Sequence, residues 1–350
     1  MFLPHLKYTV AAVTVTLLLT SCAGGSSTTP LASQQNQSHP GKRATSPCPC
    51  LYVANFGDVA NFEVSSVTVY AQGATGDATP IQDITGSNTG LNHPTDVAVD
   101  ASGNIYVASQ SNSSILVYAA GSTGNVAPIQ DISGPKTGLS MPHGLALNPL
   151  NGDIYVASGN FPSSASKVTI YPSGSTGNIP PTGVIEGMRT ALDVPYALTF
   201  NATGKIYIPN ADSNSVTIYG ASAHGDSAPI RTISGSNTGL EVPTQIALDT
   251  QRRVYVANPD DINGSVTVYA VLANGNVAPI RTIAGGRTNL HRPQGIAVDG
   301  SGLIYVANAG FSIPSIVTVY IAHANGNVAP INTISGPNTG LSGPVGIAIR

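Results

Sequence analysis

Charged side chains are scarce in this chain of 350 residues, and tryptophan is absent. Lysine, arginine, aspartate and glutamate make up 9% of the residues, against about 25% in an average soluble protein. The formal net charge of −3 gives no basic surface for a phosphate backbone, so we expect no nucleic-acid partner. No stretch beyond the N-terminal segment repeats apolar residues with the period of an amphipathic helix, which argues against a helical fold.

Motifs of several enzyme classes are missing as well. The sequence contains no glycine-rich phosphate loop, no His-Glu-x-x-His zinc motif and no Gly-x-Ser-x-Gly nucleophile motif. It also contains no pair of carboxylates with a spacing suited to acid–base catalysis. What it has instead are 38 glycines and 26 prolines, which separate short runs of valine, isoleucine and tyrosine. Short β-rich runs between turn residues predict an all-β protein.

The N-terminal segment predicts export. Lys7 precedes an apolar run over residues 8–19, which is shorter than the roughly 20 residues that a helix needs to cross a bilayer. We therefore interpret residues 1–21 as a signal peptide. The sequence L-T-S-C that ends at Cys22 resembles a bacterial lipobox. This resemblance implies a lipid on Cys22 and an anchor at the cell envelope, and Ala23 favours the outer membrane. The alternative is an ordinary signal peptide, cut after Ala23, and a secreted protein.

Residues 22–50 predict the lipidated cysteine followed by a tether. Almost nothing in residues 23–47 could join a core, so we expect disorder there, with an end-to-end distance of roughly 25–30 Å. Cys48 and Cys50 flank Pro49. A disulfide across one residue is strained, a dithiol that binds metal is a second interpretation, and we favour the third, an incidental pair at the end of the tether.

Three short motifs recur six times in the rest of the chain, and this internal repeat is the strongest signal in the sequence. The first motif is (I/L/V)-Y-(V/I)-(A/P), with its tyrosine at Tyr52, Tyr106, Tyr155, Tyr207, Tyr255 and Tyr305. The second is close to V-T-V-Y, with its tyrosine at Tyr70, Tyr118, Tyr171, Tyr219, Tyr269 and Tyr320. The third begins with a proline and an apolar run, at Pro94, Pro142, Pro195, Pro243, Pro293 and Pro344.

Each repeat of about 50 residues predicts four strands, which we call a, b, c and d. Strand a follows the proline, strand b carries the first tyrosine motif, strand c the second, and strand d reads A-P-I-x-T-I. Four-stranded units repeated four to eight times are typical of a β-propeller. The repeats begin at residue 51 with a strand b and end with a strand a. We therefore predict a six-bladed propeller over residues 51–350, closed by the last strand a joining the first strands b, c and d.

The segment 293–308, P-Q-G-I-A-V-D-G-S-G-L-I-Y-V-A-N, resembles the consensus of NHL-repeat propellers. The resemblance extends over all six repeats and implies the same fold. Propellers of this kind include peptidylglycine amidating lyase, streptogramin lyases, gluconolactonase-type enzymes and binding modules without catalysis. Their shared fold does not decide among these functions.

Departures from the repeat point to candidate functional residues, because residues that recur in every blade are explained by the architecture. In such propellers the start of strand a surrounds the central channel, and the b–c and d–a loops share one face. The first residue after each proline is Thr95, His143, Tyr196, Thr244, Gln294 or Val345, and the second is Asp96, Gly144, Ala197, Gln245, Gly295 or Gly346. Small residues are the rule at the second position, so Asp96 and Gln245 stand out.

A metal site at the channel mouth has some support. His143, in M-P-H-G-L-A-L, resembles the histidine motif of amidating-lyase propellers. Catalytic zinc needs three protein ligands, and His93 and His291 lie nearby in sequence but at other positions of the repeat. A histidine that only forms hydrogen bonds at the rim is the simpler interpretation. For Asp96 the simpler interpretation is a structural carboxylate that accepts bonds from loop N–H groups.

Phenylalanines gather in the predicted b–c loops. They are Phe56 and Phe62 in blade one, Phe161 in blade three and Phe311 in blade six. Aromatic side chains on long loops of a rigid scaffold suit recognition, and packing over the ends of the blades is the alternative.

We therefore expect a monomeric, envelope-displayed binding propeller without catalysis, metal or cofactor, which recognises a protein or a small ligand on the b–c/d–a face. The predicted contact residues are Phe56, Phe62, Phe161, Phe311, Tyr196, His143, Gln294, Thr95, Asp96 and Gln245. The alternative is a metal-assisted lyase or lactonase of the amidating-lyase, streptogramin-lyase or gluconolactonase type, with His143 and Asp96 at the channel mouth.

Overall fold

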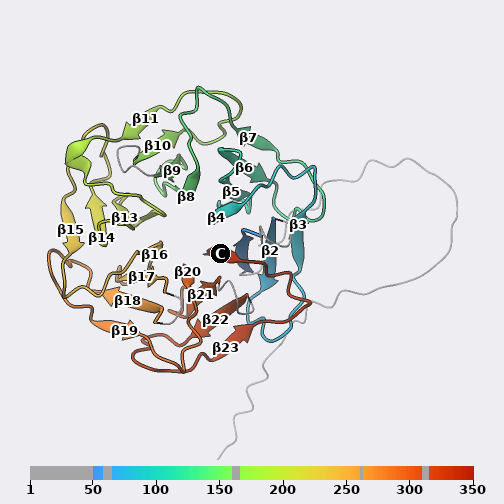
Figure 1. Cartoon of the computed structure of the whole chain (residues 1–350). Helices are drawn as coiled ribbons and strands as arrows, with labels where there is room; N and C mark the ends of the chain where they lie inside the picture. Colours follow the sequence, from blue (N-terminus) through green and yellow to red (C-terminus); the bar gives the residue numbers. More distant parts are fainter. Residues whose placement is uncertain (1–49, 58–64, 160–165, 261–262, 310–314) are drawn as a thin grey trace, which may run out of the picture. The chain divides into compact units, whose positions relative to one another are not determined.

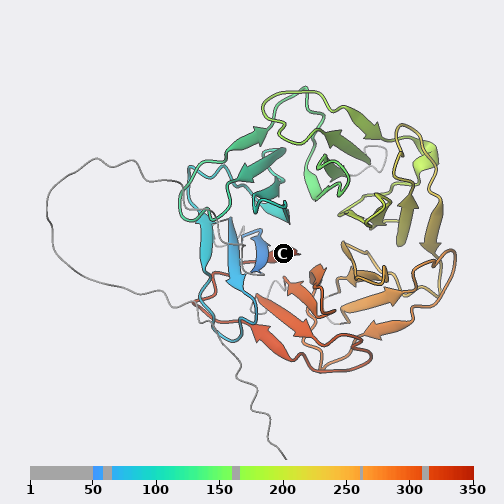
Figure 2. The same ribbon diagram turned by 180° about the vertical axis from the view of Figure 1, so that it is seen from behind.

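The computed structural model describes residues 50–57, 65–159, 166–260, 263–309 and 315–350. In this part of the chain, six four-stranded antiparallel sheets lie around a central channel, as Figure 1 shows and as Figure 2 shows from behind. We number these blades one to six in chain order, starting with the sheet β24-β1-β2-β3. The predicted six-bladed propeller with blades of four strands is confirmed.

Each strand has a fixed place between the channel and the outer edge. The innermost strands a are β24 (Pro344–Ile349), β4 (Pro94–Val99), β8 (Pro142–Leu147), β12 (Thr199–Phe200), β16 (Gln245–Leu248) and β20 (Pro293–Val298). Strands b are β1 (Cys50–Asn55), β5 (Ile105–Ser109), β9 (Ile154–Ser158), β13 (Ile206–Asn210), β17 (Val254–Asn258) and β21 (Ile304–Asn308). Strands c are β2 (Ser66–Ala71), β6 (Ser114–Tyr118), β10 (Lys167–Tyr171), β14 (Ser215–Tyr219), β18 (Ser265–Tyr269) and β22 (Ile316–Tyr320). The outermost strands d are β3 (Gln82–Thr85), β7 (Gln130–Ile132), β11 (Gly183–Ile185), β15 (Arg231–Ser234), β19 (Arg281–Ile283) and β23 (Asn332–Ile334).

The ring closes as predicted, through the last strand of the chain. β24 pairs with β1 in antiparallel register, with Leu51 opposite Ile349, and the Cys50 N–H donates to the Arg350 carbonyl at 2.8 Å. Cys50, which the sequence placed at the end of the tether, is therefore the buried first residue of β1. The C-terminus lies beside the channel (Figures 1 and 2). This pairing gives blade one the same four strands as the other five blades.

Packing between blades explains why the strands are apolar on both faces. Six core clusters fill the six interfaces, and one of them joins Val266 and Val268 of blade five to Ile304 and Val306 of blade six. Strands b and c alternate side chains between the interfaces on either side of the blade. The repeated tyrosine of strand c is buried in every blade, and in blade two the Tyr118 hydroxyl donates to the Thr89 carbonyl at 2.6 Å.

The asparagine that ends strand b in four blades also has an architectural role. In blade four the side-chain oxygen of Asn210 accepts a hydrogen bond from the Asp193 N–H in the d–a loop at 3.1 Å. The side-chain nitrogen of Asn210 donates to the Thr217 hydroxyl of strand c at 3.1 Å. The side chain thus ties the loop to the blade.

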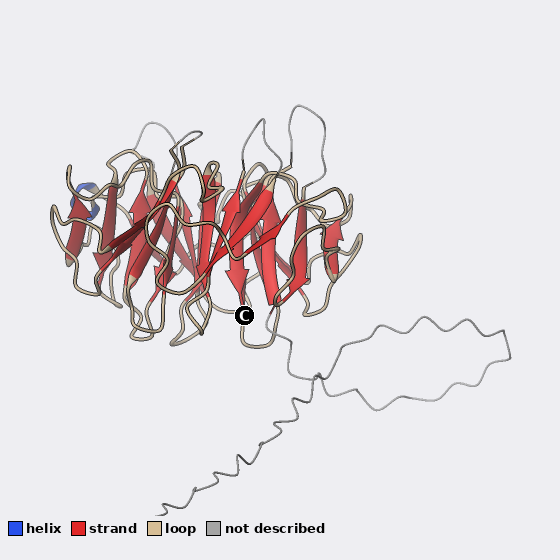
Figure 3. Cartoon of the chain, turned by 90° about the horizontal axis from the view of Figure 1, so that it is seen from below, coloured by secondary structure: helices blue, strands red, loops and turns tan. Residues whose placement is uncertain are grey.

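The two faces of the ring differ in their connections. We call the end where the inner strands begin the loop face, because the b–c and d–a loops lie there, and the opposite end the turn face, because the a–b and c–d turns lie there. The C-terminus of β24 lies on the turn face, as the side view in Figure 3 shows. Among the described residues the helical structure is the short 3₁₀ turn η2 (Met188–Thr190). No helix in that part of the chain has the length and apolar character to span a membrane.

Candidate functional site

The inner strands approach the channel through a repeated distortion of the backbone. The residue before each strand-a proline has a positive φ of 45° to 55° in every blade. These residues are His93, Met141, Val194, Val242, Arg292 and Gly343. Left-handed backbone is uncommon outside glycine and a genuine outlier for valine, so the conformation is imposed by the fold. The sequence carries no residue pattern that would have predicted it.

A bulge follows the proline at the start of several inner strands. In blade two, Pro94 pairs with Ser109 and Asp96 with Ala108, so Thr95 is the extra residue. The same shift occurs in blades one, three and six. Blade four differs, because pairing is interrupted between Pro195 and Thr199. Bulges often redirect side chains beside functional sites, and here the same bulge recurs at the start of the inner strand in four of the six blades.

Asp96 is the buried acidic group at this opening. Its side chain accepts hydrogen bonds from the N–H groups of Val97 at 2.9 Å and Leu145 at 3.0 Å. These N–H groups belong to inner strands, whose channel-facing edges have no partner strand. Burial raises the pKa of the Asp96 carboxyl to about 7, and the hydrogen bonds that it accepts only partly oppose this effect. The expected structural role, a carboxylate held by backbone N–H groups, agrees with this geometry.

Gln245 reaches Asp96 from the opposite side of the ring. Its amide donates to the Asp96 carboxylate at 2.9 Å, and both side chains are more than 90% buried. Asp96 belongs to blade two and Gln245 to blade five, which face each other across a ring of six blades. We call this pair the Asp96–Gln245 clasp. The two departures from the repeat that stood out in the sequence therefore meet in one contact.

The clasp lies at one end of a cavity of about 280 Å³ in the channel. Inner strands of all six blades line this cavity, from Asp96 and Gln245 at the loop-face end to Val99, Leu147, Leu248, Val298 and Ile349 at the turn-face end. The clasp thus separates the cavity from the opening on the loop face.

Small residues at the equivalent positions of the other blades allow this close approach. A Cβ atom on Gly144 would lie 2.5 Å from the Cα of Ala197, and one on Gly346 would lie 2.5 Å from the Cα of Asp96. A Cβ atom on Gly295 would lie 2.4 Å from the Val345 carbonyl oxygen. Glycine at these positions is therefore required by contact between neighbouring inner strands.

His143 is fixed by hydrogen bonds on both ring nitrogens. Its Nε2 lies 2.9 Å from the Gly159 carbonyl oxygen, and its Nδ1 lies 3.1 Å from the Gln110 side-chain nitrogen. A carbonyl only accepts, so Nε2 carries the proton and Nδ1 accepts from the Gln110 amide. Burial lowers the pKa of His143, although the bond to Gly159 opposes this effect. The simpler interpretation from sequence, a hydrogen-bonding rim histidine, describes this arrangement.

Tyr196 packs beside His143, with ring centroids 4.4 Å apart. It lies where pairing in blade four is interrupted, and its side chain is partly exposed. Burial and the nearby Asp212 carboxylate raise the pKa of the Tyr196 hydroxyl, while the Arg292 guanidinium opposes them. Arg292 belongs to blade six, so a cation and an anion from different blades act on this hydroxyl.

Phe56 and His93 form a second aromatic pair on the loop face, with ring centroids 4.5 Å apart. The Nδ1 atom of His93 also lies 2.7 Å from the Ser111 hydroxyl. This pair joins the b–c loop of blade one to the d–a loop before blade two. Sequence reasoning singled out Phe56 but did not predict its histidine partner.

The remaining predicted residues have different outcomes. Thr95 donates to the Pro142 carbonyl at 3.0 Å, which links blade two to blade three, and Gln294 lies partly exposed at the mouth. Phe62, Phe161, Phe311 and Cys22 lie outside the described residues, as do Cys48 and Pro49.

The described residues contain no group of three or more histidine, cysteine or acidic side chains that could hold a metal ion. Each of the three histidines considered from sequence has other contacts: His143 and His93 bond through their rings as described, and the His291 N–H donates to Asn308 at 3.1 Å. In this arrangement the mouth offers fixed polar and aromatic side chains for contact with a ligand.

Comparison with known proteins supports the fold alone. No family model matches the chain, and no curated protein matches it significantly. It is similar to a protein of unknown function from Bacteroides caccae, with a TM-score of 0.60 and 12% identity over 87% of this chain and 99% of that one. A proposed 6-phosphogluconolactonase from Bacteroides fragilis aligns with a TM-score of 0.56 and 12% identity over 88% of this chain and 100% of that one. A protein from Lactobacillus plantarum aligns with a TM-score of 0.55 and 17% identity, over 86% and 85% of the two chains.

Proposed function

We propose that this chain is a non-catalytic binding propeller of the NHL-repeat type, displayed at the bacterial envelope through a lipid on Cys22. In this proposal its loop face recognises a protein or a small ligand. The sequence supports the address through the lipobox-like L-T-S-C segment, and mass spectrometry of the N-terminal peptide tests it.

The binding proposal rests on the location of the residues that differ from their counterparts in the other blades. Repeated residues such as Tyr118 and Asn210 hold the blades together. The departures Asp96, Gln245, His143 and Tyr196 instead meet at the loop-face opening. A rigid scaffold that displays aromatic rings and polar groups on loops is suited to recognition.

The mouth residues bond to one another, which favours recognition over catalysis. Asp96 accepts three N–H donors, and both ring nitrogens of His143 have hydrogen-bond partners. A general acid or base must reach the proton that it transfers, and Gln245 covers the Asp96 carboxylate. The side chains are therefore preorganised as a surface.

One observation favours the catalytic alternative, a metal-assisted lyase or lactonase. The pKa of about 7 for Asp96 suits acid–base chemistry near neutral pH. Substrate entering from the loop face would reach that carboxylate only if the Asp96–Gln245 clasp opened, whereas the channel cavity borders it directly. Elemental analysis of the purified protein separates the two functions, because metal-free protein would remove the metal-assisted alternative.

Substitution of partly exposed aromatic residues on the loop face tests the binding function. We expect the double variant Phe56→Ala/Tyr196→Ala to lose partner binding about 30-fold, since truncating a contact residue of this kind costs about 2 kcal/mol or more. The partner would be captured from envelope extract, purified, and its dissociation constant measured with both proteins.

The matched control is Leu272→Ala, which removes a side chain that is 74% exposed on the turn face. We expect it to bind as the unchanged protein does, and melting temperatures should confirm that both variants fold. Equal binding by all three proteins would place recognition elsewhere and refute the proposal.

A further inference from the structure

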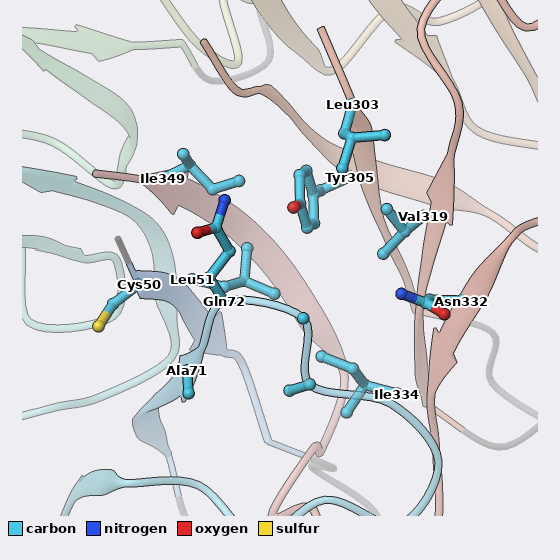
Figure 4. A pocket seen from close by; sticks show the side chains of 12 residues that line it. Cys50, Leu51, Ala71, Gln72, Leu303, Tyr305, Val319, Asn332, Ile334 and Ile349 are labelled. Atoms are coloured by element: carbon cyan, nitrogen blue, oxygen red, sulfur yellow. The ribbon is translucent and has the colours of Figure 1, made fainter. Parts of the chain in front are cut away.

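A second cavity, of about 90 Å³, lies between blades six and one on the turn face, and we call it the seam pocket. Figure 4 shows its lining side chains around an open space, with Tyr305 and Leu303 from blade six opposite Gln72 and Leu51 from blade one. The c–d turn of blade one, residues 71–73, is exposed at its rim, so the pocket is accessible there.

The equivalent position between blades five and six is filled by the chain itself. Arg281, on β19, donates to the Tyr255 hydroxyl at 3.0 Å, and its guanidinium lies over the Tyr255 ring, 5.9 Å from the centroid. Its other terminal nitrogen lies 3.0 Å from the His323 ring in the c–d turn of blade six. Arg253 completes the group, because its guanidinium bonds to the Asp249 carboxylate at 2.5 Å.

Repeat-by-repeat comparison shows why the seam pocket exists. Tyr305 corresponds to Tyr255, and it keeps the same place in strand b. In blade six, Leu303 occupies the position of Arg253 in blade five, and Asn332 occupies the position of Arg281. In the c–d turn of blade one, Gly73 occupies the position of His323 in blade six. All three replacements are smaller or neutral, and all three line the seam pocket.

The replacements also leave a carboxylate without the arginines that accompany its counterpart in blade five. Asp299 corresponds to Asp249 and is likewise buried beside its tyrosine, with the Tyr305 hydroxyl 3.4 Å away. No ion pair to Asp299 is present among the described residues. Burial and Asp299 raise the pKa of Tyr305 to about 12. At Tyr255, by contrast, Arg281 and Arg253 lower the pKa against the effects of burial and Asp249.

A third interface confirms that a guanidinium fits this position. Between blades four and five, Arg231 on β15 donates to the Val271 carbonyl at 3.0 Å. Gln72 corresponds to Val271 in the c–d turn of blade one. The seam pocket therefore presents a tyrosine ring, a tyrosine hydroxyl next to a carboxylate, and a turn carbonyl, which are the groups that receive arginine side chains at the two preceding interfaces.

We propose that the seam pocket binds a guanidinium group supplied from outside the chain. The volume of about 90 Å³ is well above the roughly 10–15 Å³ that holds a single water molecule, which leaves room for a guanidinium with a short alkyl stem. The planar cation would stack on Tyr305 and donate to its hydroxyl, as Arg281 does on Tyr255. A free small molecule and an arginine side chain of a partner share this chemistry.

Titration of the full-length protein with methylguanidinium chloride at constant ionic strength tests the proposal, with methylammonium chloride and an acetyl-Gly-Arg-Gly-amide peptide as separate arms. We expect saturable binding of one methylguanidinium and much weaker binding of methylammonium. The peptide arm distinguishes the sources: tighter binding of the peptide favours an arginine side chain, and tighter binding of methylguanidinium favours a free molecule. No saturable binding in either guanidinium arm would overturn the proposal.

Asn332→Arg should place the protein's own guanidinium in the pocket and weaken methylguanidinium binding by about tenfold or more. Thr250→Arg, which adds the same charge at an exposed position of the blade-five a–b turn, is the matched control and should leave binding unchanged. If Asn332→Arg bound methylguanidinium as tightly as the control, the ligand would lie elsewhere and the proposal would fail.

Two further variants keep the test decisive if Asn332→Arg does not fold. Gly73→His fills the pocket as His323 does at the preceding interface, and His323 itself has a φ of 68°, close to the 82° of Gly73. The triple variant Arg253→Leu/Arg281→Asn/His323→Gly gives the corresponding position between blades five and six the three residues of the seam pocket, and we expect it to bind a second methylguanidinium. Unchanged binding in Gly73→His, or a single site in a folded triple variant, would count against the proposal.

Discussion

Replacing Asp96 by asparagine should remove a pH dependence of folding stability that burial of this carboxyl creates. Burial raises the pKa of this carboxyl from its ordinary value of 3.8 to about 7 in the folded protein. Between these two pH values the folded state keeps the proton while the unfolded state releases it. The folded protein therefore loses stability as the pH rises from about 4 to about 7, and the loss is complete above the folded pKa.

The size of the effect follows from the difference between the two pKa values. The folded and unfolded pKa values differ by roughly three, and each pKa unit is worth about 1.4 kcal/mol. The free energy of unfolding therefore changes by about 4 kcal/mol. The side chain is 4% exposed, so solvent screens this effect little. A typical domain is stable by about 5–15 kcal/mol, so such a change is a large fraction of its stability.

Urea unfolding of both proteins at several pH values from 4 to 8, followed by circular dichroism, measures this difference. Other carboxylates titrate in the same range, so the quantity of interest is the free energy of the unchanged protein minus that of Asp96→Asn. We expect this difference to fall by about 4 kcal/mol between pH 4 and pH 7. A difference that stays constant over the range would mean that Asp96 titrates as it does in water, and the argument from burial would be refuted.

Two further predictions concern closure and packing of the ring. Deleting Val345–Arg350 removes β24, so we expect the protein to melt at a lower temperature and to be cut rapidly by protease; unchanged resistance would show that the ring does not depend on this strand. Gly144→Ala places a Cβ atom 2.5 Å from the backbone of Ala197 and should destabilise the protein by about 1–3 kcal/mol in urea unfolding. Gly220→Ala, where nothing lies within 4 Å, is the control and should change stability by less than about 0.5 kcal/mol; equal effects would contradict the steric explanation.

The fold could be predicted from sequence because each blade repeats the same demands. The strand-c tyrosines recur since each donates to the turn before its blade, as Tyr118 does to Thr89. The prolines recur at the entry to the inner strands, and in four blades the proline is the first residue of the strand. Closure could be predicted because the first strand b lacked a strand a before it, and β24 supplies the missing strand in the same sheet.

The candidate site was only partly predictable. Asp96 and Gln245 stood out as departures from the repeat, but they are 149 residues apart and no local pattern indicates that their side chains meet. The bulge at Thr95 and the left-handed backbone at His93 depend on how the loop enters the ring. Neither has a signal in the local sequence, because residues of ordinary type adopt these conformations under constraint from the blades.

Histidine chemistry shows the same limit. The sequence around His143 resembles a metal-binding motif, and in the structure both of its nitrogens form hydrogen bonds. One partner, Gln110, comes from blade two, and the other is a backbone carbonyl at Gly159 that no side-chain pattern identifies. Whether a histidine is available to a ligand depends on such contacts, and composition does not reveal them.

Because the chain contains six copies of one structural unit, candidate functional residues can be found by comparing equivalent positions of the six blades. A polar or charged residue that occurs in one blade has equivalent positions in five others, and those positions show what the fold alone requires. Small residues at the four positions equivalent to Asp96 and Gln245 show that the fold needs no polar side chain there, so the clasp is particular to blades two and five. Likewise, Arg281 shows that the fold accepts a guanidinium beside Tyr255. Its replacement by Asn332 therefore leaves a binding position for a cation from outside the chain.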